Sequence, residues 1–117
     1  MEPDQQRETR RARSAALFGN RYVAEVIAAI EVLAPTQEGV VTTRMVASKT
    51  QLSDSLVRPV MLRLEVVGLL AREERSGGPR SELRFRVRDQ TLWPAVTRTC
   101  AILRADGGDV ADKVGQQ

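Results

Sequence analysis

Apolar residues along the chain recur at helical spacing in several stretches that are separated by short polar or glycine-containing connections. In the first stretch, residues 17–34, apolar side chains return every three to four positions and stop before Pro35. This spacing predicts one amphipathic helix, which could begin as early as Ser14. Residues 1–13 are polar and charged, and we expect them to form a flexible basic arm or a frayed helix start.

The next apolar pattern predicts two helices joined by a tight turn. Val40 and Val41 could form a brief strand, and Thr42 is a plausible N-cap for the short helix that follows. A longer helix is predicted over about 53–67, and Gly68 stands where a left-handed residue favours glycine at a helix end. The apolar stripe of this helix, at i, i+3, i+4 and i+7, consists of Val57, Val60, Met61 and Leu64.

The hydrophobic period then changes from 3.6 to 2, which is typical of strands. Residues 69–75 and 81–88 flank the sequence SGGPR, whose Gly-Gly-Pro predicts the tip of a hairpin. In the second segment Leu83, Phe85 and Val87 alternate with arginines, so one face of this strand is apolar and the other basic.

A last apolar pattern predicts a final helix that starts near Leu92, with Pro94 in its first turn. The elements together predict a mostly α domain with a small β-hairpin (α+β) over residues 14–105, followed by a flexible tail over 106–117. A chain of 117 residues fits one domain with a modest core.

Positive charge is concentrated in the middle of the chain. Residues 44–88 hold ten Lys and Arg against five Asp and Glu, a surplus of five, whereas residues 1–43 and 89–117 each have one excess negative charge. A basic middle between neutral flanks indicates a polyanionic partner. The alternative is a solvated surface with a bias toward Arg, which outnumbers Lys sixteen to two.

The chemistry of the chain argues against several classes of protein. There is no histidine, and Cys100 is the single cysteine, so a zinc site or a general-base histidine is not expected. No glycine-rich phosphate loop follows a strand. We therefore expect neither an enzyme nor a cofactor or metal. One cysteine and the absence of an apolar segment long enough to span a membrane lead us to expect a cytoplasmic protein without a membrane partner.

The run TTRMVASKTQLSDSLVRPVMLRLEVVGLLAREERSGGPRSELRFRV resembles the DNA-binding core of small bacterial repressors of the ArsR-like and MarR-like kinds. The resemblance covers residues 17–104 in the order of elements, and its most specific part is SDSLVRPVMLRLEVVGLL. It implies a winged helix-turn-helix whose second helix, about 53–67, enters the major groove of double-stranded DNA. The hairpin, about 70–88, would then be the wing on the minor groove or backbone.

The resemblance implies a set of DNA-binding residues. On the helix of residues 53–67, the side opposite the apolar stripe would face the groove, and Arg58 is the best candidate to read a guanine edge. The wing arginines and two cations of the preceding helix would contact the backbone. The expected DNA-binding residues are Arg44, Lys49, Ser53, Asp54, Ser55, Arg58, Arg75, Arg80 and Arg84.

Plainer interpretations exist for some of these residues. Ser53 could simply cap the helix, with Asp54 complementing its dipole, and Arg58 could be a solvated side chain. The wing could be a solvated edge strand that its charge keeps soluble. Pro59 removes one helical hydrogen bond, so we expect a bent first turn or a helix start nearer Ser55.

The sequence departs from the resembling families in three ways. Gln51 stands in the turn where glycine is frequent, and Leu62 is expected on the outward side, where many relatives have a polar residue. Leu62 could contact a thymine methyl group there. The paired cysteine and histidine ligands of ArsR-like metal sensors are missing, because the chain has one cysteine and no histidine.

Terminal helices pair the subunits in many such regulators, so the resemblance also implies a homodimer. An apolar pocket between the first and last helices could bind a small-molecule effector, as in MarR-like relatives. Alternatively, the apolar residues of both helices complete the core of one protomer. Cys100 is interpreted as a buried filler, although a disulfide across the dimer axis is possible. The expected dimerisation residues are Phe18, Tyr22, Val26, Trp93, Val96, Cys100 and Leu103.

Two function classes remain open at this point. The first is a sequence-specific transcriptional regulator, a dimeric repressor that blocks polymerase by occupying an operator. The second is a winged-helix module for protein–protein interaction, which the few cations of the helix at 53–67 keep open. A plasmid or mobile-element partition or replication protein that binds DNA would have the same sequence features as the first.

Overall fold

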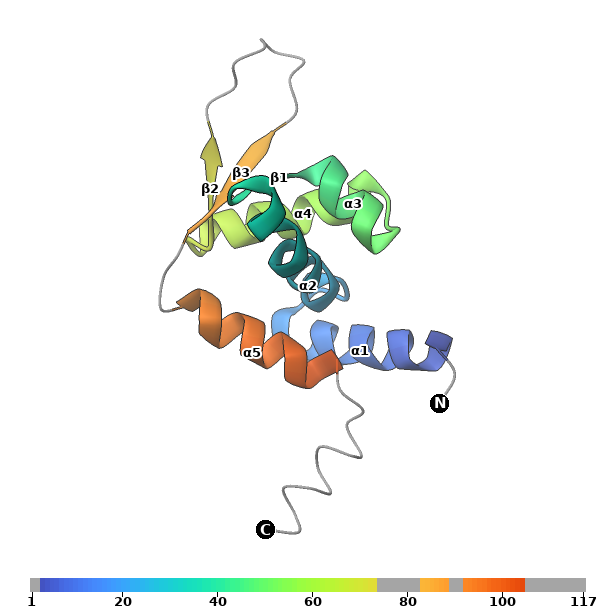
Figure 1. Cartoon of the computed structure of the whole chain (residues 1–117). Helices are drawn as coiled ribbons and strands as arrows, with labels where there is room; N and C mark the ends of the chain where they lie inside the picture. Colours follow the sequence, from blue (N-terminus) through green and yellow to red (C-terminus); the bar gives the residue numbers. More distant parts are fainter. Residues whose placement is uncertain (1–2, 74–82, 89–91, 105–117) are drawn as a thin grey trace.

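The computed structural model describes residues 3–73, 83–88 and 92–104, which form a helical domain around a small sheet. Figure 1 shows α1 and α5 in one layer, with α2 crossing above them and α3, α4 and the sheet on the far side of α2. The elements are α1 (Pro3–Phe18), α2 (Val23–Leu33), the 3-10 helix η1 (Ala34–Gln37), β1 (Val40–Thr42), α3 (Thr43–Thr50), α4 (Asp54–Val66), β2 (Leu70–Glu73), β3 (Arg84–Val87) and α5 (Leu92–Arg104).

The N-terminal region differs from the sequence-based prediction. The predicted single helix is broken between Phe18 and Val23, because Gly19 adopts a left-handed φ of 74° and its N–H bonds to the carbonyl of Ala15 at 2.9 Å. The Asn20 side chain then accepts a hydrogen bond from Tyr22 N at 2.8 Å and closes the turn.

Residues 4–13 belong to α1 and are helical, whereas the sequence predicted a flexible basic arm or a frayed helix start. Arg11 explains the order of this segment, because its guanidinium donates two hydrogen bonds to the buried carboxylate of Glu25 on α2. Ser14 also joins α1 to the start of α2, because its hydroxyl donates a hydrogen bond to Asn20 O at 2.7 Å and accepts one from Ala24 N at 3.2 Å. The predicted tail, residues 106–117, lies outside the described residues.

The two central helices follow the sequence-based prediction closely. Thr42 caps α3, since its hydroxyl accepts a hydrogen bond from Met45 N at 3.1 Å. Gln51 takes a left-handed φ of 60° in the turn between α3 and α4, which explains why glycine would suit this position. Gly68 has a φ of 86° directly after α4 and ends it as predicted.

Pro59 is tolerated within α4 because of where it lies. The helix begins at Asp54, so Pro59 is its sixth residue, and its ring is exposed to solvent. The first turn is closed without its N–H, because the amides of Leu56 and Val57 both donate to Ser53 O, at 3.0 and 3.1 Å. The predicted alternative of a helix start nearer Ser55 is therefore not needed.

The sheet has three strands in the order β1-β3-β2, and both pairings are antiparallel. The predicted hairpin of β2 and β3 is confirmed, with Leu70 opposite Val87. β3 is the central strand rather than an edge strand, because β1 pairs with its other side and sets Val41 opposite Phe85. Residues 74–82, which include the predicted hairpin tip, lie outside the described residues.

The hydrophobic core lies between α2, α4, α5 and the inner face of the sheet. The predicted stripe of α4 is fully confirmed as buried, and Phe85 of β3 is buried against it. Val26 and Cys100 are 0% and 1% exposed inside this protomer, so neither side chain is available to a partner subunit. Their assignment to a dimer interface is therefore corrected: both complete the core of one chain.

Candidate nucleic-acid interface

One side of α4 is apolar and buried, and the other carries exposed polar residues. Ser53, Asp54, Ser55 and Arg58 are all exposed at the N-terminal end of the helix, opposite the buried stripe. A helix buried along one side and polar along the other can enter a groove while it stays packed on its own domain. The four residues that the sequence placed on the outer side of this helix are thus exposed together at its N-terminal end.

A small hollow joins this end of α4 to two other elements. It has a volume of about 160 Å³ and is lined by Thr43 and Arg44 at the start of α3, Asp54 and Arg58 of α4, and Leu83 just before β3. The hollow therefore lies where the helix pair meets the base of the hairpin. Thr43 and Leu83 were not selected from the sequence; their placement follows from the packing of α3 and β3 beside α4.

Several of these polar groups are not engaged within the protein. Within residues 3–73, 83–88 and 92–104, the Arg58 guanidinium has no hydrogen-bond or ion-pair partner. Ser53 stands at the N-cap position, but its side chain makes no capping hydrogen bond and instead lies 2.9 Å from the hydroxyl of Ser55. The hydroxyls of both serines face solvent and can serve an external ligand.

The arginines of the hairpin divide into two groups. Arg72 donates to Glu65 at 2.9 Å and lies over the ring of Phe85, while Arg86 pairs with Glu73 and donates to Glu38 O at 3.3 Å. These two arginines hold the sheet to its neighbours.

Arg84, in contrast, is exposed on β3 and has no such partner among the described residues. It is therefore the cation of this strand that is best placed to meet an external anion. The other two predicted wing cations, Arg75 and Arg80, lie outside the described residues.

Lys49 does not lie with the other predicted DNA-binding residues. Arg44 and Lys49 are both exposed on α3, but Arg44 lines the hollow at α4, whereas Lys49 lines another hollow beside Arg7 and Arg10 of α1. Leu62 is also placed differently from the prediction, since its side chain is partly buried and packs against the core. A contact between Leu62 and a thymine methyl group is therefore not supported.

The predicted dimerisation residues that remain on the surface are half-buried. Phe18, Tyr22, Trp93, Val96 and Leu103 all pack partly against the core and keep part of their surface exposed. Leu17 of α1 and Ile102 of α5 are more exposed, at 57% and 53%, and only the structure identifies them as surface apolar residues. Most of this set belongs to α1 and α5, which lie in contact (Figure 1).

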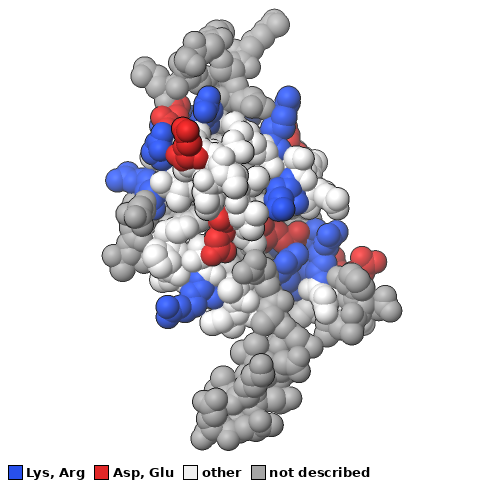
Figure 2. Space-filling model, viewed as in Figure 1, with Lys and Arg blue, Asp and Glu red and all other residues white. Residues whose placement is uncertain are grey.

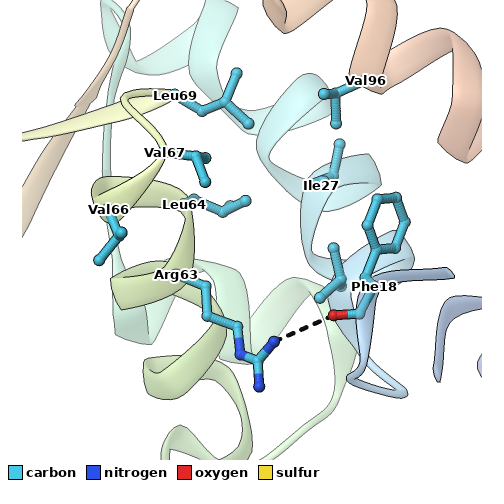
Figure 3. Close-up of a pocket in the computed structure, with 9 residues that line it drawn as sticks. Phe18, Ile27, Arg63, Leu64, Val66, Val67, Leu69 and Val96 are labelled. Carbon is cyan, nitrogen blue, oxygen red and sulfur yellow. Dashed lines mark hydrogen bonds between the residues drawn. The ribbon is translucent and has the colours of Figure 1, made fainter.

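An apolar groove separates the end of α4 from α2 and α5. It has a volume of about 440 Å³, and Figure 3 shows Leu64, Val67 and Leu69 on one wall and Ile27, Val96 and Phe18 on the other. Its rim carries one charged side chain, Arg63 of α4, which donates to the carbonyl of Phe18 at 3.1 Å (Figure 3). The predicted pocket between the N-terminal and C-terminal helices is present, and α4 forms its third wall.

Comparison with known proteins identifies the fold. No protein-family model matches the chain, and no curated protein sequence matches it. The chain resembles the crystal structure of MepR, a transcription regulator of the Staphylococcus aureus multidrug efflux pump MepA, with a TM-score of 0.57. The match covers 97% of this chain and 77% of MepR at 12% sequence identity, so it bears on the fold alone. The fold is a winged helix-turn-helix.

The winged helix-turn-helix gives the elements of this chain their places. α3 and α4 form the helix-turn-helix, β2 and β3 form the base of the wing, and the exposed end of α4 lies between them. No helix within the described residues is long and apolar enough to cross a membrane. The hollow that Arg58 lines thus lies between the helix-turn-helix and the base of the wing, where Leu83, the neighbour of Arg84 in the chain, forms part of its wall.

Proposed function

We propose that the chain is a sequence-specific double-stranded DNA-binding transcriptional regulator that acts as a dimeric repressor. The observation that carries this proposal is the Arg58 guanidinium, which is exposed at the N-terminal end of α4 without a partner in the described chain. In this arrangement α4 lies in the major groove, which is wide enough for a helix, and Arg58 donates two hydrogen bonds to a guanine edge.

The residues around Arg58 fit the same geometry. The hydroxyls of Ser53 and Ser55 can donate to phosphate or base edges, and the helix N-terminus adds backbone N–H groups that favour phosphate. Asp54 is an acceptor, which on a base edge suits the amino group of cytosine. Arg44 and Arg84 flank the helix and would contact phosphates, which fixes the register of α4 without reading sequence.

The proposed dimer is formed by α1 and α5. These helices carry exposed Leu17 and Ile102 in addition to the half-buried Phe18, Trp93 and Leu103. A two-fold pairing through this layer would leave both copies of α4 uncovered. Two recognition helices related in this way match a palindromic site with half-sites about one DNA turn apart.

The apolar groove supports a proposed effector site in the same regulator. Its walls come from α2, α4 and α5, so a small apolar molecule that filled it would change the position of the end of α4 relative to the proposed dimer layer. Arg63 would transmit this change, because it ties α4 to the carbonyl at the end of α1.

A winged-helix protein-interaction module is the second candidate function. This function is favoured by Val66 and Val67 at the end of α4, whose side chains are 84% and 56% exposed. Adjacent exposed apolar side chains are typical of a surface that binds another protein. Such a module would bind through the end of α4 rather than through Arg58. Substitution of Arg58 would then leave its binding unchanged.

The deciding experiment is selection of a bound sequence from a random duplex library at two salt concentrations. We expect enrichment of a palindrome, because a symmetric dimer presents two copies of α4. Arg58→Ala should lose about 1 to 3 kcal/mol on the enriched site and little on random DNA. Arg98→Ala is the matched control, since Arg98 is an exposed arginine of α5 with no partner in the described chain.

Two results would contradict the proposal. Absence of DNA binding would favour the protein-interaction module instead. Binding that is steeply salt-dependent but enriches no sequence would indicate a protein that contacts only the backbone, since phosphate contacts carry no sequence information.

A further inference from the structure

A second hollow lies away from Arg58, between α1, α2 and the end of α3. It has a volume of about 220 Å³; Arg7 and Arg10 of α1 line one side, and Lys49 of α3 lines the other. Its floor is formed by α2, where Ala28 and Ala29 leave room above the backbone. Figure 2 shows Lys and Arg atoms at the right of the molecule, between α3 and the N-terminal half of α1, with Asp and Glu atoms beside them.

The base of the hollow is a buried ion-pair cluster. Glu25 is 4% exposed at its side chain, and both of its carboxylate oxygens accept hydrogen bonds from Arg11. Arg10 Nη2 lies 3.8 Å from the same carboxylate. The hydrogen bonds from Arg11 to Glu25 raise the pKa of Arg11, so its guanidinium stays charged. The Glu25 carboxylate thus lies against both guanidinium groups and holds them in place, and Glu8 lies 3.7 Å from Arg11 as well.

The charges around the hollow do not balance. Arg7, Arg10, Arg11 and Lys49 contribute four positive charges, whereas Glu25 and Glu8, whose carboxylate lies 3.7 Å from Arg11 Nη1, contribute two negative charges, which leaves a surplus of two. The dipole of α3 accounts for only one of these cations, Lys49, because a positive charge in the last turn of a helix is stabilised by the dipole. It does not explain why two arginines from another helix line the same space.

We propose that this hollow binds a phosphoryl group, held by Arg7, Arg10 and Lys49. A volume of about 220 Å³ suits inorganic phosphate or a small phosphate ester and excludes a large ligand. Arginine side chains match phosphate oxygens with paired N–H donors, and the ion pair with Glu25 holds Arg10 in place before the anion arrives. The phosphoryl group comes either from a small phosphorylated molecule or from the backbone of a nucleic acid.

The first arm of the test uses inorganic phosphate and the full chain, so it does not depend on the proposed regulator function. Thermal unfolding is followed while phosphate replaces chloride at constant ionic strength. The melting temperature should rise saturably with phosphate. The double variant Arg7→Gln, Lys49→Gln should bind phosphate at least about tenfold more weakly, because each substitution removes a charge-assisted contact.

The variants are chosen so that loss of folding does not confuse the result. Arg7 and Lys49 are exposed and have no side-chain partner within the described chain, so the double variant should stay folded and unfold at a urea concentration close to that of the parent protein, with a small loss from the Lys49 charge at the end of α3. Arg98→Gln, which changes an exposed arginine of α5, should bind phosphate as the parent does. If phosphate stabilises all three proteins equally, the hollow is not the site and the proposal is wrong.

The second arm distinguishes the two sources of the phosphoryl group. The slope of log K against log salt is measured on a long duplex for the parent and the double variant. A slope smaller by about 2 in the variant would assign the hollow to the DNA backbone. Phosphate binding with an unchanged slope would assign it to a small phosphorylated molecule. If phosphate does not specifically stabilise the protein and the slope is the same in the parent and the double variant, the proposal is wrong.

Discussion

Glu25 shows how a single residue can decide the path of the chain. It lies within the apolar pattern of α2, where its carboxylate is buried and paired with Arg11. A buried carboxylate needs a cation and hydrogen bonds, and α1 supplies both through Arg11, fourteen residues earlier in the chain. The ion pair therefore holds α1 against the domain, although the polar sequence of this segment does not by itself predict that it packs there.

Glu25→Gln is predicted to destabilise the domain by about 2 kcal/mol. Loss of a partner from a buried pair costs 3 to 5 kcal/mol, and the partial exposure of Arg10 and Arg11 reduces that cost. Urea unfolding followed by circular dichroism measures the loss. Glu31→Gln, an exposed carboxylate on the same helix, should change the free energy of unfolding by less than about 0.5 kcal/mol. Equal effects of both substitutions would mean that the ion pair contributes little.

At the scale of the elements, the two helices of the helix-turn-helix begin in different ways. The hydroxyl of Thr42 accepts a hydrogen bond from the amide of Met45 in the first turn of α3, whereas Ser53 stands at the same position of α4 and makes no side-chain capping hydrogen bond. A helix start without a side-chain cap retains free N–H groups. In a recognition helix these groups are available to phosphate, which fits the proposed function of α4.

Replacement of each cap residue by alanine should separate these roles. Thr42→Ala is expected to cost about 1 kcal/mol of stability, because α3 loses a cap that is buried at 4% exposure. Ser53→Ala should cost less than about 0.5 kcal/mol, because no capping hydrogen bond is lost. Chemical denaturation measures both values. A cost for Ser53→Ala that equals the cost for Thr42→Ala would restore the interpretation of Ser53 as a structural cap.

At the scale of the whole molecule, the two ends of the chain form one layer. α1 and α5 lie in contact below α2, on the side away from α3 and the sheet (Figure 1). The most exposed apolar residues of this layer, Leu17 and Ile102, were not selected from the sequence as dimerisation residues, whereas Val26 and Cys100, which were selected, lie in the core. The apolar surface therefore includes only part of the predicted set, namely its half-buried members, together with these two residues.

Leu17→Glu combined with Ile102→Glu is predicted to convert the proposed dimer into a monomer. Both side chains are more than half exposed, so the double variant should remain folded while charge repulsion opposes pairing of the subunits. Analytical ultracentrifugation measures the mass of the particle in solution. Val32→Glu is the control, because Val32 is 54% exposed but belongs to α2. An unchanged mass for the double variant, or a parent protein that is itself monomeric, would exclude this interface.

The sequence by itself determined the local elements that form the site. The stripe of α4, the Thr42 cap, the stop at Gly68 and the alternation in β3 depend on spacing and backbone preference, which neighbouring residues set. The four exposed residues of α4 could be named for the same reason. Each of them follows directly from the position of the buried stripe on one helix.

Only the tertiary structure decided how distant segments meet and which charges remain available. Arg84 and Arg86 alternate on the same basic face in the sequence, but only the structure shows that Arg86 is paired with Glu73 of β2. Lys49 was grouped with Arg44, but it lines a separate hollow together with Arg7 and Arg10 of α1. Ion pairs and strand pairings join residues that are far apart in the chain, so no local pattern encodes them. They determine which cations of this basic chain can meet a partner.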